Sequence, residues 1–267
     1  MLAVLFTRRW LTALLVAVLF FVACGFLGRW QFHRYEDRRQ QVDLVEAYYD
    51  ADPLPLDQVL PEGSDLPSDQ VWRRVEVSGE YDAAAQLMVR NRPQNVTYGF
   101  EQLVPLTLPE GDAILVDRGW VQNAERADVV PDVPEAPGGT VQVVGWLRQG
   151  EAALDRSMPP GQVASIDLAE AADRTGYPLR GAYLLLDSED VGDGTTPPRP
   201  QPLLPPVTDT GPHLAYALQW WGASIVGFVL VVVYARREHL DSLPEGDPRK
   251  ERARKPKKLR VWDEEDG

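Results

Sequence analysis

Two long apolar segments without a charged residue constrain this chain more than any other feature. The first covers residues 10–27 and the second covers residues 215–235. A helix of the first segment's 18 residues would span about 27 Å, close to the thickness of a bilayer's hydrocarbon core. Only a helix satisfies its own backbone hydrogen bonds in lipid, so both segments predict membrane-spanning helices. The alternative is a pair of buried core helices, which would rarely be so long and so uniformly apolar.

The basic residues beside these segments predict the orientation. Two Arg precede the first segment and two follow the second, at Arg8, Arg9, Arg236 and Arg237. The positive-inside rule then puts both termini in the cytoplasm of a multi-pass protein. A cleaved signal peptide is a weaker interpretation, because no Ala-x-Ala site follows, and a lipoprotein box at Cys24 fits poorly. No transit segment is present, which favours a bacterial cell membrane.

The predicted organisation follows from these spans. It comprises a cytoplasmic N-terminus (1–9), a first membrane helix (10–28), an extracytoplasmic domain (29–212), a second membrane helix (213–235) and a charged, disordered cytoplasmic tail (236–267). Residues 190–212 carry seven Pro and predict an extended, semi-rigid linker. Small residues at Ala17, Cys24, Gly25 and Gly28 would permit close packing of the two helices.

The charge balance excludes several classes of protein. The chain has 27 Lys and Arg against 40 Asp and Glu, a net charge of −13, so a nucleic-acid-binding role is not expected. A single Cys excludes a disulfide framework. The sequence contains neither a Gly-rich phosphate loop nor a nucleophile elbow, so we expect no enzyme.

The region between the helices predicts a mainly β domain. Segments rich in Val, Leu and aromatic residues alternate with Pro, Gly and Asp clusters, which is typical of a barrel or sandwich with few helices. Short helices are expected at 168–175, with Asp167 as N-cap and Gly176 as stop, and at 34–49, continuing the first membrane helix. The predicted strands are 71–79, 86–91, 99–106, 113–120, 141–148, 163–167 and 182–187.

The start of the second apolar segment carries the strongest candidate for chemistry. His213, Tyr216, Ala217 and Trp220 follow a spacing that places them on one helix face. Neutral imidazole is a common axial ligand of haem iron, and the aromatic residues would offer a surface for a flat macrocycle. The alternative is an aromatic belt that only anchors the helix at the interface.

Other polar residues have simpler interpretations. His33 is expected to be a solvated interfacial residue, and Cys24 an inert buried thiol. Arg90, Arg92 and Arg118 lie in or beside predicted strands. These Arg residues would either bind a propionate or carboxylate, or form internal salt bridges in an acidic domain.

Several short motifs, in order between the two apolar segments, resemble the Surfeit locus protein 1 family. They are Gly28-Arg29-Trp30-Gln31 with Arg34, Asn91-Arg92, Gly99-Phe100, Pro105-Leu106, Val116-Asp117-Arg118-Gly119-Trp120-Val121, Gly145, Leu147-Arg148 and Pro212–Trp220. Three positions depart from the family pattern: Asp117 replaces Asn, and Gly211-Pro212 replaces an Asn pair.

The resemblance implies a non-enzymatic assembly factor for haem–copper cytochrome c oxidase. It implies binding of haem a, with His213 as the iron ligand, and help in placing haem in subunit I or in stabilising that subunit. The implied partners are subunit I, the haem a synthesis machinery and the lipid bilayer. For the cofactor, Tyr216 and Trp220 would form the pocket face. A haem-free scaffold that binds oxidase subunits or other assembly factors is the alternative.

Overall fold

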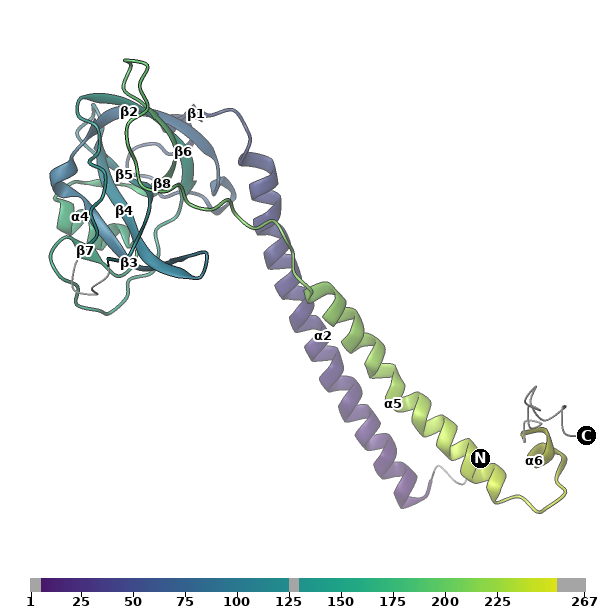
Figure 1. Ribbon diagram of the computed structural model, residues 1–267. Helices are drawn as coiled ribbons and strands as arrows, with labels where there is room; N and C mark the ends of the chain where they lie inside the picture. The colour runs from purple at the N-terminus through teal and green to yellow at the C-terminus, as the bar shows by residue number, and fades with distance from the viewer. Residues whose placement is uncertain (1–5, 125–129, 254–267) are drawn as a thin grey trace, which may run out of the picture. The chain divides into compact units, whose positions relative to one another are not determined.

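The computed structural model describes residues 6–124 and 130–253 (Figure 1). The chain forms two compact units. One comprises Met1–Arg39 with Thr210–Gly267, and the other comprises Gln40–Asp209. We refer to them as the helical unit and the β domain and describe each by itself.

Two long helices form the helical unit. Helix α2 covers Arg8–Tyr48, so its last residues belong to the β domain, and helix α5 covers His213–Asp241. Both are long and apolar enough to cross a membrane. The predicted continuation of the first membrane helix through residues 34–49 is therefore confirmed to within one residue.

The predicted disorder of the charged tail is wrong for its first part. Helix α5 continues through Arg236 to Asp241, and helix α6 covers Pro248–Ala253. Arg and Glu are good helix formers, so the helix extends beyond the apolar residues without a break. Residues 254–267 lie outside the described residues.

Small residues bring α2 and α5 together. A Cβ atom added at Gly227 would lie 3.5 Å from the Cβ of Ala17, and the Phe21 and Phe228 rings meet edge to face at 5.6 Å. Cys24 is buried. Gly25, which we expected to contribute to this packing, has nothing within 4 Å of an added Cβ, so that part of the prediction is wrong.

Eight strands form the sheet of the β domain. They are β1 (Leu54–Pro55), β2 (Arg74–Tyr81), β3 (Leu87–Gln94), β4 (Thr97–Thr107), β5 (Ala113–Gln122), β6 (Thr140–Arg148), β7 (Gln162–Val163) and β8 (Leu179–Asp190). Their order is β1-β2-β6-β8-β5-β4-β3-β7. An additional pairing of β2 with β4 closes the central strands into a ring. The sheet is mixed, because β5 and β8 run parallel. These findings confirm the prediction of a β-rich, barrel-like domain between two apolar helices.

One predicted strand is much shorter than expected, and another begins later in the sequence. The segment 163–167 contributes only the pair Gln162–Val163 to the sheet. The segment 71–79 enters the sheet at Arg74, because Trp72 has a positive φ of 70°, which interrupts extended backbone.

Two short helices each contribute a buried residue to the apolar core of the domain. Helix α3 covers Leu56–Val59, and helix α4 covers Leu168–Thr175, as predicted. The Asp167 side chain caps α4 by accepting a hydrogen bond from the Glu170 N–H at 2.7 Å. Gly176 ends the helix in the left-handed conformation with φ 79°.

The alternation of side chains divides the domain into two apolar clusters. One cluster includes Ile114 and Val116 of β5 with Leu147 and Leu184, together with Leu56 and Leu60 of the α3 segment. The other includes Leu115 of β5, Ala171 of α4, and the residues Val89, Leu103 and Ile166. Neighbouring residues of β5 therefore face opposite sides of the sheet.

The Pro-rich segment is held by the domain along part of its length. Gln201 and Trp120 exchange two backbone hydrogen bonds, of 2.8 and 3.0 Å, which form an isolated bridge. The Gln94 side chain donates to the Pro202 carbonyl at 3.2 Å. Residues 201–202 of the predicted linker are thus hydrogen-bonded to the β domain and form part of its surface.

Candidate functional site

His213 is the first residue of α5, and its ring contacts a polar side chain on α2. The His213 Nδ1 atom lies 2.9 Å from the Gln31 Oε1 atom. Pro212 precedes the helix, and Gly211 adopts the left-handed conformation with φ 70°. Proline needs no hydrogen-bond acceptor at this point, and glycine turns the chain without strain.

The contact with Gln31 selects one form of the imidazole. An amide oxygen can only accept, so Nδ1 of His213 carries the hydrogen and donates it to Gln31. The lone pair of the neutral ring then lies on Nε2, which is the atom able to coordinate a metal. Metal-binding histidines in proteins are commonly oriented in this way through their other nitrogen.

The two predicted aromatic partners lie on the first turns of α5. Tyr216 is 47% exposed and Trp220 is half-buried, while Ala217 is fully buried. The helical backbone supports the expected shared face of His213, Tyr216 and Trp220.

Sequence reasoning missed the aromatic residue that contacts α2. Trp221, not Trp220, lies against Gly28, where any Cβ would collide with the indole ring. Phe32 completes this contact, with its ring centroid 5.7 Å from that of Trp221. Gly28 and Gln31 both belong to the first motif of the family resemblance, so the sequence did contain a signal for this region.

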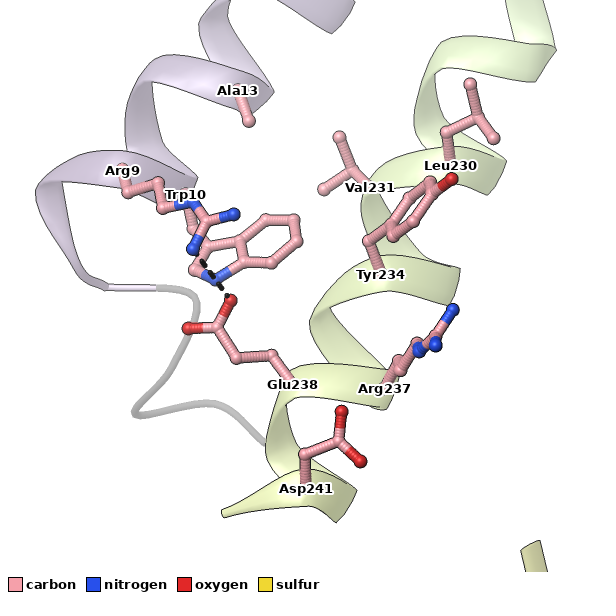
Figure 2. A pocket seen from close by; sticks show the side chains of 9 residues that line it. All are labelled: Arg9, Trp10, Ala13, Leu230, Val231, Tyr234, Arg237, Glu238 and Asp241. Atoms are coloured by element: carbon pink, nitrogen blue, oxygen red, sulfur yellow. Dashed lines mark hydrogen bonds and ion pairs between the residues drawn. The ribbon is translucent and has the colours of Figure 1, made fainter. Parts of the chain in front are cut away.

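The other end of the helix pair contains a groove with an aromatic and charged lining. Figure 2 shows Trp10 of α2 facing Tyr234 of α5, with Arg9 and Glu238 joined by an ion pair of 3.4 Å. Its volume is about 580 Å³. Trp, Tyr and Arg together are typical of the boundary between membrane and water.

His33, a lesser candidate, is exposed, and its Nδ1 atom lies 3.3 Å from the Glu36 carboxylate. Within residues 6–124 and 130–253, no cluster of three or more His, Cys, Asp or Glu side chains has the arrangement of a metal site.

In the β domain, Arg118 is a buried structural residue. Its Nη2 and Nε atoms donate to Glu189 at 2.6 and 3.3 Å, and Nη1 donates to Gln102 at 3.2 Å. The remaining hydrogen bonds reach the carbonyls of Pro134 and Pro198. The internal salt bridge, one of the two interpretations of Arg118, is therefore the observed one.

Asp117, the neighbour of Arg118, is also buried but incompletely partnered. Its Oδ1 atom accepts from the Gly119 N–H at 3.0 Å, whereas Oδ2 has no hydrogen-bond partner within the described part of the chain. Burial, and then the charge of Glu101, raise the pKa of Asp117 well above its ordinary value.

A second group of ionisable residues lies beside Asp117. Arg92 contacts Glu101 at 2.8 Å and Glu151 at 2.6 Å. Burial raises the pKa of Glu101 to about 7, although Arg92 opposes the shift. The pKa of Glu151 is lowered, because hydrogen bonds from Arg92 and from the Ile166 N–H outweigh partial burial.

A cavity of about 300 Å³ lies between the sheet and the Pro-rich segment. Aromatic side chains of Tyr49, Trp72 and Trp146 line one part of it, and residues 202–206 form another wall. Its polar lining residues are Asp117, Asp187 and Arg199.

The sequence is similar to a protein family and to several known proteins. The pattern described as the SURF1 family matches residues 18–225. Uncharacterized SURF1-like proteins from Mycobacterium bovis and Mycobacterium tuberculosis are 32% identical over 259 residues, covering 92% of this chain and 93% of each relative. A SURF1-like protein from Rickettsia bellii is 23% identical over 227 residues, covering 83% of this chain and 90% of the relative.

Proposed function

Because this chain belongs to the SURF1 family, which is associated with cytochrome oxidase assembly, we propose that it binds haem a and helps to place it in oxidase subunit I. Assembly factors of this family are generally non-enzymatic. The partners in this proposal are subunit I, the haem a synthesis machinery and the lipid bilayer.

The observation that carries the haem proposal is the pair of His213 and Gln31. The Nδ1 atom of His213 is hydrogen-bonded to the Oε1 atom of Gln31 on α2 at 2.9 Å, so the lone pair on Nε2 remains available to coordinate iron. A single imidazole could hold haem, because the macrocycle itself binds the iron and the protein need supply few ligands. His213 and Gln31 therefore have the chemistry that a haem-binding site requires.

Within this proposal, the chain's own residues have separate roles. His213 ligates the iron, Gln31 fixes the ring, and Tyr216 and Trp220 offer apolar surface to the macrocycle. Haem a supplies the redox-active iron that the oxidase needs. Holding it in this way would keep an apolar, reactive group away from water until it is transferred.

We further propose that residues 10–28 and 213–235 span the cell membrane with both termini in the cytoplasm. The Arg residues and aromatic residues around the groove of Figure 2 support a cytoplasmic boundary at that end. The region 29–212 then lies outside, and His213 is placed at the outer boundary.

The test is the absorption spectrum of the purified full chain, co-expressed with the haem a synthesis enzymes. A haem band is expected for the wild type and for His33→Ala, which is the matched control. His213→Ala should abolish the band. Co-purification of oxidase subunits without any chromophore would instead favour the haem-free scaffold.

A second variant tests the role of Gln31. Gln31→Leu keeps the size of the side chain but removes the acceptor of the Nδ1 hydrogen. Loss of an orienting partner typically weakens metal binding by about 10–100-fold, so a lower haem content and a shifted band are expected. An unchanged spectrum would contradict the positioning role while leaving the ligand assignment to the His213→Ala result.

A further inference from the structure

We propose that the cavity enclosed by strands β5 and β8 on one side and residues 199–206 on the other binds a small compound. The compound has an apolar body and a carboxylate or carbonyl oxygen, and this oxygen accepts hydrogen bonds from Asp117 and Arg199. The site uses none of the residues proposed to hold haem. It therefore adds a second binding function, located in the β domain.

The volume and lining suit a compact apolar molecule. About 300 Å³ is at the lower end of the usual range for small-molecule sites. Leu185 and Leu186 of β8 line the cavity on the sheet, and the segment 202–206, Pro-Leu-Leu-Pro-Pro, lines it opposite. Such a lining favours burial of apolar atoms and leaves orientation to a few polar groups.

Asp117 is the polar group that lacks a partner. The residue is only 1% exposed, and its Oδ2 atom has no hydrogen bond to any described residue. A buried polar atom without a hydrogen-bond partner is energetically unfavourable, so a ligand atom that supplies the partner would be favoured. Because burial and Glu101 raise the pKa of Asp117, its protonated form is favoured. A protonated carboxyl donates a hydrogen bond, so it requires an acceptor.

The second polar group is also a donor. The Arg199 Nη1 atom donates to the Asp187 backbone carbonyl at 2.7 Å, which fixes the side chain beside the cavity. The Asp187 carboxylate is already paired with Arg74. Arg199 has no carboxylate partner within residues 6–124 and 130–253, so its other N–H groups favour an oxygen acceptor.

The aromatic part of the lining offers ring surface rather than polar atoms. Tyr49 and Trp146 stack at 4.4 Å with an interplanar angle of 2°. The Trp146 Nε1–H donates to the Tyr49 carbonyl at 2.9 Å, so it is not available to a ligand. Trp72 meets Tyr49 edge to face at 6.1 Å. The apolar body of the ligand is therefore expected against these rings.

The experiment uses the full chain in lipid nanodiscs, with empty nanodiscs as the blank. The probes are hexanoate and hexylammonium, which share an apolar chain and differ in charge and in hydrogen-bonding direction. Binding is measured by saturation-transfer difference NMR. We expect hexanoate to bind and hexylammonium to bind at least about 10-fold more weakly, since an ammonium group cannot accept the hydrogen bonds that Asp117 and Arg199 would donate.

Two pairs of variants identify the site. Asp117→Leu should weaken hexanoate binding by about 10-fold, whereas Asp117→Asn keeps a donor and should stay within about 3-fold. Leu204→Trp should fill the cavity from the opposite wall and abolish binding. Its control is Leu154→Trp, because Leu154 is similarly exposed, at 46% against 52%, and does not line the cavity. Near-UV circular dichroism verifies the fold of each variant.

Three results would overturn the proposal. They are failure of hexanoate to bind the wild type, equal binding of hexylammonium, and full binding by a folded Leu204→Trp variant. Each of them leaves the haem test untouched, because that test depends on His213 and Gln31 alone.

Discussion

The two faces of strand β5 each carry a buried ionisable side chain, and these two side chains differ in how completely they are hydrogen-bonded. On one face, every nitrogen of the Arg118 guanidinium donates a hydrogen bond, and Glu189 receives two of these bonds as well as one from Tyr81 at 3.0 Å. On the other face, Asp117 leaves one carboxylate oxygen without a partner among the described residues. The two residues are equally buried, each 1% exposed.

The difference distinguishes a polar group whose hydrogen bonds hold the fold together from one that could still bind a ligand. The Arg118 network joins β5 to β8 and to the loops at Pro134 and Pro198, so it fixes non-local geometry. Networks of this kind are stable only when every member is satisfied. Asp117 and Glu101 instead carry raised pKa values, a pattern that is enriched at functional sites. Three predictions test this contrast.

The largest effect is expected from Glu189→Ala. The substitution leaves the Arg118 guanidinium buried without its counter-charge, and breaking a buried pair typically costs about 3–5 kcal/mol. The free energy of unfolding, followed by tryptophan fluorescence in urea, should fall by that amount. The control is Glu170→Ala, which removes a more exposed pair with Arg174 within one helix, and should cost about 0.5 kcal/mol or less. A loss below about 1 kcal/mol for Glu189→Ala would contradict the structural role of the network.

A smaller, pH-dependent effect is expected from Glu101. Its pKa is raised from 4.5 to about 7 in the folded domain, so between these values the folded state binds more protons than the unfolded state. Stability is then highest below the unfolded pKa and falls as the pH rises through about 7, by an amount on the order of 2–3 kcal/mol. Glu101→Gln should remove this part of the dependence, as measured by urea unfolding at pH 5 and pH 8.

The matched control for that experiment is Glu62→Gln, since Glu62 is an exposed carboxylate. It should retain the wild-type difference between the two pH values. Glu151 does not interfere, because its pKa is lowered from 4.5 and its contribution changes only at lower pH. Stability that rises from pH 5 to pH 8 in the wild type, with no change in Glu101→Gln, would show that Glu101 is ionised in the folded domain.

Local signals in the sequence predicted much of the fold. Helix α4 begins and ends where Asp167 and Gly176 predict, because caps and left-handed stops depend only on neighbouring residues. Hydrophobic runs located most strands to within a few residues. The closure of the barrel by β2 and β4, and the strand β1, were not predictable, since they depend on pairings between distant segments.

The candidate site was predictable in part for the same reason. His213 was identified from its helix and the family resemblance, but Gln31 is 182 residues away in the sequence, and only folding shows that they are adjacent. In the sequence, Asp117 and Arg118 are simply two charged residues near the end of one predicted strand. The hydrogen-bond partners of Arg118 come from segments distant in the sequence, and no local pattern predicts which segments these are.

The smallest effect is expected from Asp117→Asn. The amide keeps the shape of the carboxyl group and the acceptor for the Gly119 N–H, while adding a donor and removing the ability to ionise. Because burial raises the pKa of Asp117 in the folded state, the cost of ionising the carboxyl group grows with pH, so the substitution should stabilise the domain more at pH 8 than at pH 5. Unfolding in urea at the two pH values measures this difference. A loss of more than about 2 kcal/mol at pH 8 would mean that the ionised carboxylate is needed, and the two faces of β5 would then hold the same kind of closed network.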